Sequence, residues 1–391
     1  MSNRRYILAI MLTAYALVYF HRTMTGVVKE QVDLLANYYG IDSSLLASAF
    51  FSAYFYAYAL AQPLTGVLLD TYGAKRICSM FLIAMSISTL MITLPSPITL
   101  VLGRAFVGLF ATVVFLAAQR SASLLYTSGE QALITGFLLM IGNISTALGT
   151  YPLQLFIGRY GFVALFYVLA VLSLILGLAI YVFSSDKGGN EKGLGVLDIY
   201  KGLGKAIKDP RAWSIPLTTI AIYDTSLAFQ SGWGQVYFRE IGFDEQTTGL
   251  LLMYTALLFA LFTPFMGYLS DRVFKSRKPF LALGSLFSAI AWLIALWGFR
   301  VKEMSLTMLF IPVLSIAYSM HTPAVPMIKE LYSTDYVAVI VSFHNIVLFT
   351  ALAILLSIST YLTTDMMCIA SAILGIIGAV LSAFFSKESY K

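Results

Sequence analysis

The chain has 391 residues and a formal net charge of +6, with 59% hydrophobic but only 11% charged residues. Soluble domains carry about 25% charged residues, and no soluble fold of this size could bury so much apolar surface. The composition therefore excludes a soluble globular protein and indicates a chain that lies largely in lipid. No nucleic-acid-binding motif accompanies the basic charge, so we expect no nucleic-acid partner.

Long apolar runs recur along the whole chain, each close to the length of about 20 residues that crosses a bilayer as a helix. Barrel strands are excluded because they are only about ten residues long and alternate in polarity. Six runs precede a polar stretch: 6–28, 44–66, 77–95, 98–124, 133–155 and 161–184. Six runs follow it: 211–233, 246–267, 280–300, 305–326, 336–362 and 366–386. The sequence thus predicts an all-α membrane protein with twelve transmembrane helices in two six-helix bundles, residues 1–184 and 211–391, joined by a cytoplasmic linker over 185–210.

The distribution of lysine and arginine predicts how the chain is oriented. With a cytoplasmic N-terminus, 17 of the 25 basic residues fall in cytoplasmic segments, five in outer loops and three inside spans. We therefore expect a multi-pass protein of the cell (inner) membrane with both termini in the cytoplasm. The first apolar run is too long for the core of a signal peptide and has no small-residue cleavage site. Within the linker, residues 197–207 have the pattern of an interfacial amphipathic helix.

An acidic loop pattern occurs once in each half of the chain. Gly66-x-Leu68-x-Asp70 follows the second span, and Gly267-x-Leu269-x-Asp271-Arg272 follows the eighth. The three shared positions are each 201 residues apart. Two six-helix halves with the same loop at the same place indicate a transporter built from parallel repeats.

The segment Gly-Val-Leu-Leu-Asp-Thr-Tyr-Gly-Ala-Lys-Arg at 66–76 resembles the loop motif of the major facilitator superfamily, Gly-x-Leu-x-Asp-Arg-x-Gly-x-basic-basic, with Thr71 in place of the usual arginine. Arg104-x-x-x-Gly108 in the fourth span resembles the second motif of that family. The resemblance implies two pseudo-symmetric bundles that rock about a midplane site, which gives alternating access.

The resemblance also implies a conformational latch at the two acidic loops. Its members are Gly66, Asp70, Gly73, Lys75 and Arg76 in the first half, and Gly267, Asp271 and Arg272 in the second. The aspartate is expected to cap a helix N-terminus or to pair with a cation in one state only. The alternative is an ordinary turn whose charges anchor a helix end.

Two segments bear on the branch of the family. The fifth span, with Gly142, Asn143 and Pro152, lacks the Gly-Pro-rich motif of the antiporter branches, which disfavours a drug/proton antiporter. The first span ends with Tyr-Phe-His-Arg at 19–22. This resembles the Tyr-x-Asp-Arg of anion:cation symporters, and more closely the Tyr-Phe-x-Arg of a branch that includes a lysosomal dipeptide transporter. His21 replaces the acid of the symporters, which puts the proton role of that acid in doubt.

Arg22 is the first candidate for substrate binding, since a charge inside a bilayer is costly and usually functional. Tyr15, Tyr19 and Arg22 lie on one face of the predicted helix. A guanidinium flanked by tyrosines suits a carboxylate or a phosphate, which it can bind through two hydrogen bonds. The alternative is that Arg22 extends to the outer headgroups.

Asp224 is the acidic residue well inside a predicted span, and the offset of 201 maps Arg22 onto its neighbour Tyr223. Three interpretations stay open. Asp224 takes up a proton when it is desolvated, it binds the amino group of a zwitterion whose carboxylate lies on Arg22, or it accepts hydrogen bonds from hydroxyls such as that of Thr225.

The three histidines all lie in predicted spans, where an imidazole can couple proton movement to transport. His21 and His321 are candidates for proton coupling, together with Asp224 and Arg104. His344 is related to Asn143 by the same offset of 201 residues, and we expect this pair to line the cavity. A structural role is the alternative for each histidine. Because the histidines lie at different depths, we expect no metal site, and no cofactor motif is present.

Two further residues complete the candidate substrate site. Tyr58 lies in an aromatic stretch of the second span. Arg120, near the cytoplasmic end of the fourth span, is expected to hold the substrate or to guard the inner mouth, and the alternative is contact with the inner headgroups.

The sequence therefore predicts a monomeric secondary transporter for a small polar solute with a carboxylate: an amino acid, a dipeptide or an organic anion. Proton symport and uncoupled uniport of dipeptides both stay open. A membrane-embedded enzyme would need a nucleophile–base pair or a metal cluster, a channel would need a selectivity element, and a primary pump would need a Gly-x-x-x-x-Gly-Lys loop. None of these is found, so we expect no enzymatic activity.

Overall fold

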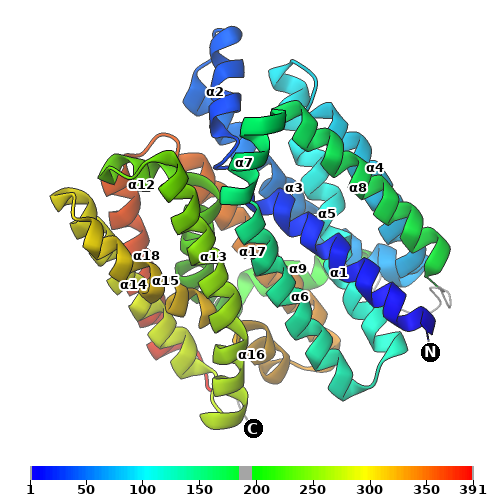
Figure 1. The fold of residues 1–391 in the computed structure, drawn as a ribbon. Coiled ribbons are helices and arrows are strands. Elements are labelled where there is room, and N and C mark those ends of the chain that lie inside the picture. Colours follow the sequence, from blue (N-terminus) through cyan, green and yellow to red (C-terminus); the bar gives the residue numbers. More distant parts are fainter. Residues whose placement is uncertain (1, 185–195, 390–391) are drawn as a thin grey trace. The chain divides into compact units, whose positions relative to one another are not determined.

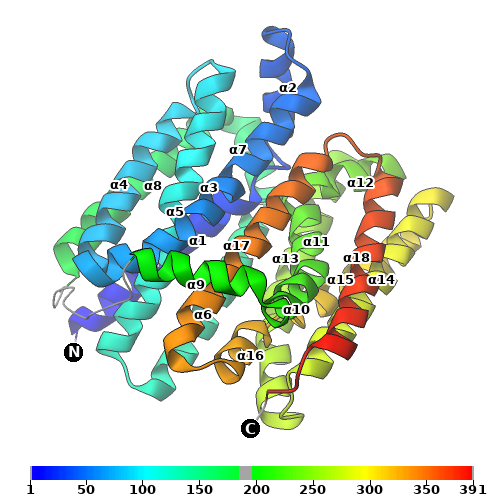
Figure 2. The same ribbon diagram turned by 180° about the vertical axis from the view of Figure 1, so that it is seen from behind.

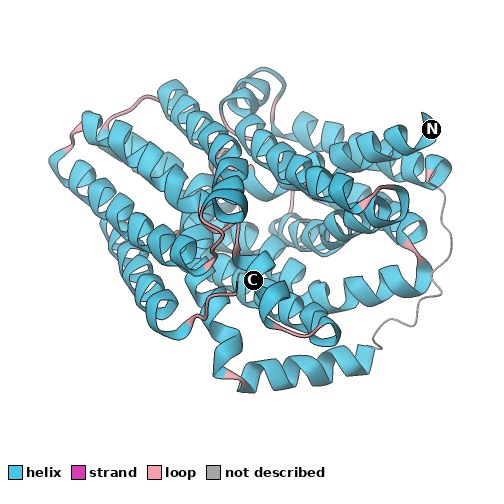
Figure 3. Ribbon diagram, turned by 90° about the horizontal axis from the view of Figure 1, so that it is seen from below, coloured by secondary structure: helices cyan, strands magenta, loops and turns pink. Residues whose placement is uncertain are grey.

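The computed structural model of the protein describes residues 2–184 and 196–389, and every regular element within these ranges is a helix (Figure 3). Residues 185–195, the first part of the predicted linker, lie outside the described ranges. The chain divides into two compact units, Met1–Ile199 (unit 1) and Tyr200–Lys391 (unit 2). The division falls within one helix, α9 (Val196–Lys208).

Unit 1 is drawn in blue to green in Figure 1. Its helices before α9 are α1 (Ser2–Thr23), α2 (Lys29–Tyr38), α3 (Ser43–Tyr72), α4 (Ala74–Met91), α5 (Pro97–Leu125), α6 (Ser128–Leu148), α7 (Tyr151–Tyr160) and α8 (Phe162–Phe183). In this unit α3 packs along α5, α4 packs along α8, and α1 packs along both α6 and α5. These contacts bring α1, α3 and α5 together, and the candidate site of unit 1 lies on these three helices.

Unit 2 is drawn in green to red and is seen from behind in Figure 2. Its elements after α9 are α10 (Pro210–Thr219), η1 (Ile220–Asp224), α11 (Thr225–Ala228), η2 (Phe229–Trp233), α12 (Gly234–Ile241), α13 (Glu245–Tyr268), η3 (Leu269–Val273), α14 (Lys278–Val301), α15 (Met304–Ser319), α16 (Ala324–Leu331), α17 (Thr334–Ile358) and α18 (Thr364–Phe385). The segments η1, η2 and η3 are π-helical. Here α14 packs along both α18 and α15, and η1 contacts α18, α17, α14 and α15.

The predicted spans have helical counterparts along the described chain. Ten helices are long and apolar enough to cross a membrane, or eleven if the bent pair α6 and α7 forms one span. The predicted seventh span is not among them; it corresponds to the helical run Pro210–Ile241, which contains the π-helical segments η1 and η2. With this run included, each of the twelve predicted spans is accounted for.

Two details of the helical layout differ from the predicted runs. The first run was expected to continue to residue 28, but α1 ends at Thr23 and the predicted outer loop contains an additional helix, α2. The fifth span is broken: α7 is bent by 47° from the last part of α6. Gly149 caps α6, and Pro152 lies in the first turn of α7, where its missing N–H group is tolerated.

Helix association inside a bilayer depends on close packing and hydrogen bonds, because lipid tails are as apolar as leucine. In unit 1 a Cβ atom on Gly108 of α5 would lie 2.1 Å from the carbonyl oxygen of Tyr54 on α3. In unit 2 a Cβ atom on Gly375 of α18 would lie 2.6 Å from the amide nitrogen of Ala289 on α14. Glycine is therefore required at both crossings for the helices to approach this closely.

Each chain terminus lies beside a loop of its own unit. In unit 1 the Tyr126 hydroxyl, after α5, donates to the Arg4 carbonyl at 2.9 Å. In unit 2 the Glu388 carboxylate accepts a hydrogen bond from the Lys278 backbone N–H, at the start of α14, at 3.2 Å. Both loops follow an even number of predicted spans, as the termini do in the predicted topology. Which side is cytoplasmic stays a prediction.

The helix predicted within the linker is present as α9 (Figure 2). In unit 2 the Tyr336 hydroxyl donates to the Gly202 carbonyl at 3.3 Å, and a Cβ atom on Gly202 would lie 2.8 Å from the side chain of Val339 on α17. Leu203 and Ala206 are buried, whereas Lys201 is exposed. This helix thus has the two faces that the sequence pattern indicates.

Candidate functional site

Arg22 lies in the last turn of α1 and is buried, with 3% of its surface exposed. Its guanidinium carbon is 4.6 Å from the ring centroid of Tyr19 and 5.0 Å from that of Tyr58 on α3. Aromatic faces attract cations, and more strongly where water is excluded. The side chain therefore turns inward onto two tyrosine rings, which argues against the alternative that it extends to the headgroups.

The tyrosines around Arg22 are held in place by helical spacing on α1 and α3. Tyr15 and Tyr19 are four residues apart on α1, with ring centroids separated by 5.1 Å. Tyr54 and Tyr58 are four residues apart on α3, with stacked rings 6.0 Å apart. Arg22 and these four tyrosines form the Arg22 cluster. Tyr54 belongs to the same aromatic stretch of the second span as the predicted Tyr58, and the spacing of four residues between them is the signal that relates the two.

A glycine on α6 makes room for the Arg22 cluster. A Cβ atom on Gly142 would lie 3.0 Å from the ring of Tyr19, which is tighter than almost all observed contacts. The Ser145 hydroxyl, one turn later, donates to the Ala16 carbonyl of α1 at 2.5 Å. Asn143, predicted to line the cavity, follows Gly142 and is buried. The α1–α6 crossing thus fixes the ring on which Arg22 rests.

A second buried cation, Arg104 of α5, shares Tyr54 with the Arg22 cluster. Its guanidinium carbon lies 4.7 Å from the Tyr54 ring centroid, and its Nη1 donates to the His21 carbonyl at 2.6 Å. Within the described residues, Arg104 forms no ion pair, and its Nε and Nη2 atoms have no hydrogen-bond partner. The two ring nitrogens of His21 are likewise without a partner there. The interior of unit 1 therefore concentrates positive charge next to neutral polar groups.

Asp224 is fully buried at the end of η1 in unit 2. Within the described part of the chain, neither of its carboxyl oxygens has a hydrogen-bond partner. The Thr225 hydroxyl, which was the proposed structural partner, donates instead to the Ala221 carbonyl at 2.9 Å. The same carbonyl also accepts from the Ser288 hydroxyl at 2.8 Å. Because burying a charged carboxylate without a partner is costly, Asp224 is suited to hold a proton or to receive a cation.

His321, one of the two histidines of unit 2, lies against a pair of tyrosine rings. The Tyr223 ring is 5.4 Å from that of Tyr318 and 4.8 Å from the imidazole of His321. His321 contacts the Tyr318 carbonyl through Nδ1 at 2.5 Å, in the break between α15 and α16. His344 on α17 is buried, and α17 packs against η1, the element that holds Tyr223.

The acidic loop of unit 1 pairs Asp70 with a cation. Asp70, near the end of α3, accepts a hydrogen bond from Nη1 of Arg120 on α5. Arg120 was predicted as a substrate contact or an inner gate, and the structure pairs it with Asp70 of this acidic loop. Gly73, with φ of +85°, connects α3 to α4 in a conformation that favours glycine. Lys75 lies over the ring of Tyr181 at 5.4 Å, whereas Arg76 is exposed.

The acidic loop of unit 2 is built around Arg277, which was not predicted. Its Nη1 donates to the Asp271 carboxylate, and its Nη2 lies 3.0 Å from the carboxylate of Glu330 on α16. Arg272, the predicted basic member, is exposed and forms no ion pair among the described residues. The signal for Arg277 was present, because the offset of 201 residues that relates the two loops also maps Arg76 onto Arg277.

The C-terminal tail joins this second loop. The Glu388 carboxylate accepts from the Arg277 backbone N–H at 2.9 Å and from the Ser276 hydroxyl at 2.5 Å. The Ser389 hydroxyl donates to Glu330 at 2.6 Å. The two loop glycines differ in their surroundings. A Cβ atom on Gly267 would lie 3.4 Å from the Thr322 methyl group, whereas a Cβ atom on Gly66 would meet no described atom within 4 Å.

A sequence profile of the Major Facilitator Superfamily matches residues 11–238 and 217–391, which together cover nearly the whole chain. The chain therefore belongs to this superfamily. It is a multi-pass membrane transporter of the secondary type and not an enzyme.

Solved structures share the fold. One of them, described as the crystal structure of D-xylose-proton symporter, aligns over 98% of this chain and 97% of its own, with a TM-score of 0.76 and 13% sequence identity. At this identity the likeness concerns the fold alone. No curated protein sequence matches the chain. The branch of the superfamily is therefore not identified by these comparisons.

Proposed function

We propose that the protein transports a small polar solute with a carboxylate or a similar anionic group by alternating access, and that the Arg22 cluster binds the anionic group. The observation that carries this proposal is a buried guanidinium, 3% exposed, that lies over the rings of Tyr19 and Tyr58. A guanidinium presents its N–H donors in one plane and can bind both oxygens of a carboxylate. The adjoining tyrosine hydroxyls can donate to the same group.

The charges of unit 1 support an anionic solute. Between residues 2 and 184 the sequence has five acidic residues: Glu30, Asp33, Asp42, Asp70 and Glu130. The first two lie in α2, Asp42 caps α3, and Glu130 is in the first turn of α6. Asp70 is near the end of α3 and pairs with Arg120. The helix interiors that hold Arg22 and Arg104 therefore contain no carboxylate of their own, and a solute carboxylate would supply the missing negative charge.

In unit 2, Asp224 is proposed to take up a proton or the cationic group of an amphoteric solute during transport. This proposal is supported by the fact that the carboxyl group is fully buried and has no hydrogen-bond partner within the described chain. An unpartnered charge is costly at such a buried site, and the arrival of a proton or a cation neutralises the carboxylate. Proton symport and uncoupled transport of an amino acid or dipeptide are the two forms that this role can take.

The test of the anion site is a thermal-shift screen of purified protein with carboxylates, their uncharged amides, organic phosphates and sugars. A ligand that binds only the native state raises the melting temperature by mass action. Removal of a hydrogen bond to a charged group costs about 1.5–3 kcal/mol, so Arg22→Gln is expected to weaken carboxylate binding by about 10- to 150-fold. Arg5→Gln is the matched control, because Arg5 is on the same helix but exposed.

Three results separate the outcomes of this screen. Stabilisation of wild type and Arg5→Gln by carboxylates, with a weak response of Arg22→Gln, supports the proposal. Stabilisation only by sugars contradicts the substrate class. An equal response of Arg22→Gln and wild type to carboxylates contradicts the assignment of the site.

A further inference from the structure

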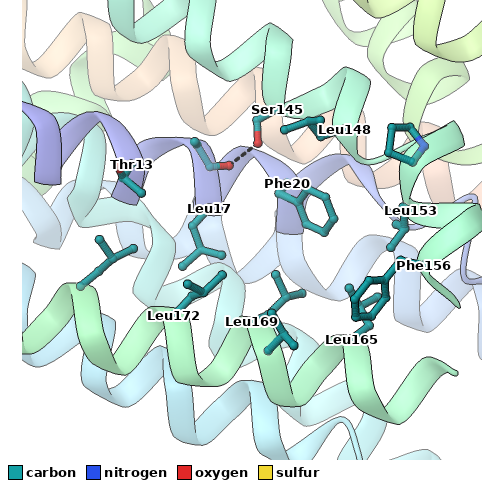
Figure 4. A pocket seen from close by; sticks show the side chains of 14 residues that line it. Thr13, Leu17, Phe20, Ser145, Leu148, Leu153, Phe156, Leu165, Leu169 and Leu172 are labelled. Carbon is teal, nitrogen blue, oxygen red and sulfur yellow. Dashed lines mark hydrogen bonds between the residues drawn. The ribbon is translucent and has the colours of Figure 1, made fainter. Parts of the chain in front are cut away.

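An apolar groove lies on unit 1 where α7 bends away from α6. It has a volume of about 380 Å³ and is lined by side chains of α1, α6, α7 and α8. Figure 4 shows Leu17 of α1 facing Leu169 and Leu172 of α8, with Phe156 of α7 at one end. The 47° bend between α6 and α7 separates the two halves of this span. The groove is therefore a consequence of the break at Gly149 and Pro152.

The polar atoms of the groove are already engaged by the backbone. The Thr13 hydroxyl donates to the Ala9 carbonyl at 2.9 Å, and the Ser145 hydroxyl donates to the Ala16 carbonyl at 2.5 Å. The remaining lining side chains are apolar. A polar solute would find no hydrogen-bonding group here in exchange for its hydration, so the groove is unsuited to the transported substrate and suited to an alkyl chain.

The groove opens on the surface of unit 1 that the lipid covers. Val168 and Leu172, which line it from α8, are 45% and 42% exposed. Both belong to Phe162–Phe183, a helix long and apolar enough to span a membrane. Exposed apolar side chains within such a span face hydrocarbon, so an acyl chain can enter the groove sideways from the bilayer.

A basic residue lies one helical turn beyond the end of the groove. Pro152 and Phe156 line the groove from α7, and Arg159 follows them at the spacings i+7 and i+3, on the same face of the helix. Arg159 is exposed in the last turn of α7, and its guanidinium carbon lies 5.5 Å from the ring centroid of Tyr160. It forms no ion pair among the described residues, whereas Arg239 and Arg300, on other predicted outer segments, pair with Glu245 and Asp365.

We propose that this groove binds one bilayer phospholipid, with an acyl chain between α1, α7 and α8 and its phosphate on Arg159. The guanidinium supplies a two-point contact for phosphate oxygens at the height where a span ends and headgroups begin. The apolar lining and the cation beyond it match the two parts of a phospholipid, in the order in which the lipid presents them. This site is independent of the proposed substrate site, because none of its residues belongs to the Arg22 cluster.

The test uses delipidated full-length protein in detergent, titrated with phosphatidylglycerol and followed by native mass spectrometry. Leu172→Trp fills the groove from its open side without touching the buried core, and Leu178→Trp is the matched control on the same helix at 48% exposure outside the groove. Arg159→Gln removes the phosphate contact, and Arg239→Gln is the matched control for the change in charge.

The expected result is one tightly bound lipid in wild type and in both controls. Arg159→Gln weakens its binding by about fivefold, the effect of one basic residue near an anionic surface, and Leu172→Trp weakens it by at least about tenfold because several methylene groups lose their site. Wild-type binding by either test variant overturns the proposal. Equal binding of a fatty alcohol, which has no phosphate, also overturns it. The proposal is also overturned if wild type is a dimer and Leu172→Trp is a monomer, because the groove would then hold a second copy of the chain.

Discussion

A substitution at Gly108, where α3 and α5 cross, tests the packing that holds the Arg22 cluster. A Cβ atom at this position would lie 2.1 Å from the Tyr54 carbonyl oxygen and 2.7 Å from the Tyr54 Cα and carbonyl carbon. All three atoms are backbone, so Gly108→Ala can be accommodated only if the two helices separate. Overpacking of this kind costs about 1–3 kcal/mol.

The expected change in melting temperature follows from the size of the unit. For a domain of about 150–250 residues, each kcal/mol lowers the melting temperature by about 2–4 °C. Unit 1 falls in this range, so Gly108→Ala should melt about 2–12 °C below wild type. The same separation moves Tyr54 and Tyr58 away from Arg22 and should weaken carboxylate binding.

The assay must report on unit 1 alone, and the sequence offers a way to do this. All four tryptophans, Trp213, Trp233, Trp292 and Trp297, lie in unit 2. Cys78 is fully buried in unit 1 and Cys368 is fully buried in unit 2. On a Cys368→Ala background, a thiol-reactive dye reports the exposure of Cys78 on heating, while tryptophan fluorescence reports on unit 2.

Gly136→Ala is the control for the glycine substitution. A Cβ atom at Gly136 in α6 would meet nothing within 4 Å, so alanine should leave the melting temperature unchanged or raise it through its better helix propensity. If Gly108→Ala exposes Cys78 at the wild-type temperature, or if Gly136→Ala lowers this temperature equally, the packing argument is refuted.

Two further predictions concern unit 2. Arg277→Gln leaves the carboxylates of Asp271 and Glu330 without their cation, and we expect the free energy of unfolding to fall by about 1–2 kcal/mol after allowance for the exposure of Asp271. Tryptophan fluorescence should therefore show a lower melting temperature. Arg272→Gln, which removes an exposed arginine, should leave the melting temperature unchanged. Asp224→Asn keeps the shape of the buried side chain, so the protein should remain folded while it loses either the acid stimulation of uptake or the preference for solutes with an amino group. A variant that keeps both properties in proteoliposomes would rule out a transport role for Asp224.

The helices and the repeat could be predicted from the sequence because they rest on local patterns. The apolar runs of span length are helices in the structure, and the two acidic loops related by the offset of 201 residues each hold an aspartate–arginine pair. The breaks could not be placed in this way, since both sides of a break are equally apolar. The π-helical segments around Asp224 and the 47° bend between α6 and α7 are backbone features that hydropathy does not report.

The partners of the candidate residues depended on contacts between distant helices. The face shared by Tyr15, Tyr19 and Arg22 follows from spacing on one helix, but nothing local indicates that Tyr58 lies against Arg22. Likewise the pairing of Asp70 with Arg120 joins residues 50 positions apart. Arg277 could have been found, because the internal repeat maps it onto Arg76. Long-range pairs of this kind can be identified only from a structure or by applying the offset of 201 residues to every candidate residue.

The most direct test of the central claim is counterflow in proteoliposomes loaded with an unlabelled carboxylate that stabilises the purified protein. The account predicts that wild type and Arg5→Gln accumulate the labelled carboxylate transiently and do not accumulate its uncharged amide. Arg22→Gln, folded and reconstituted to the same level, should lose this carboxylate flux. Undiminished carboxylate counterflow by Arg22→Gln would contradict the account.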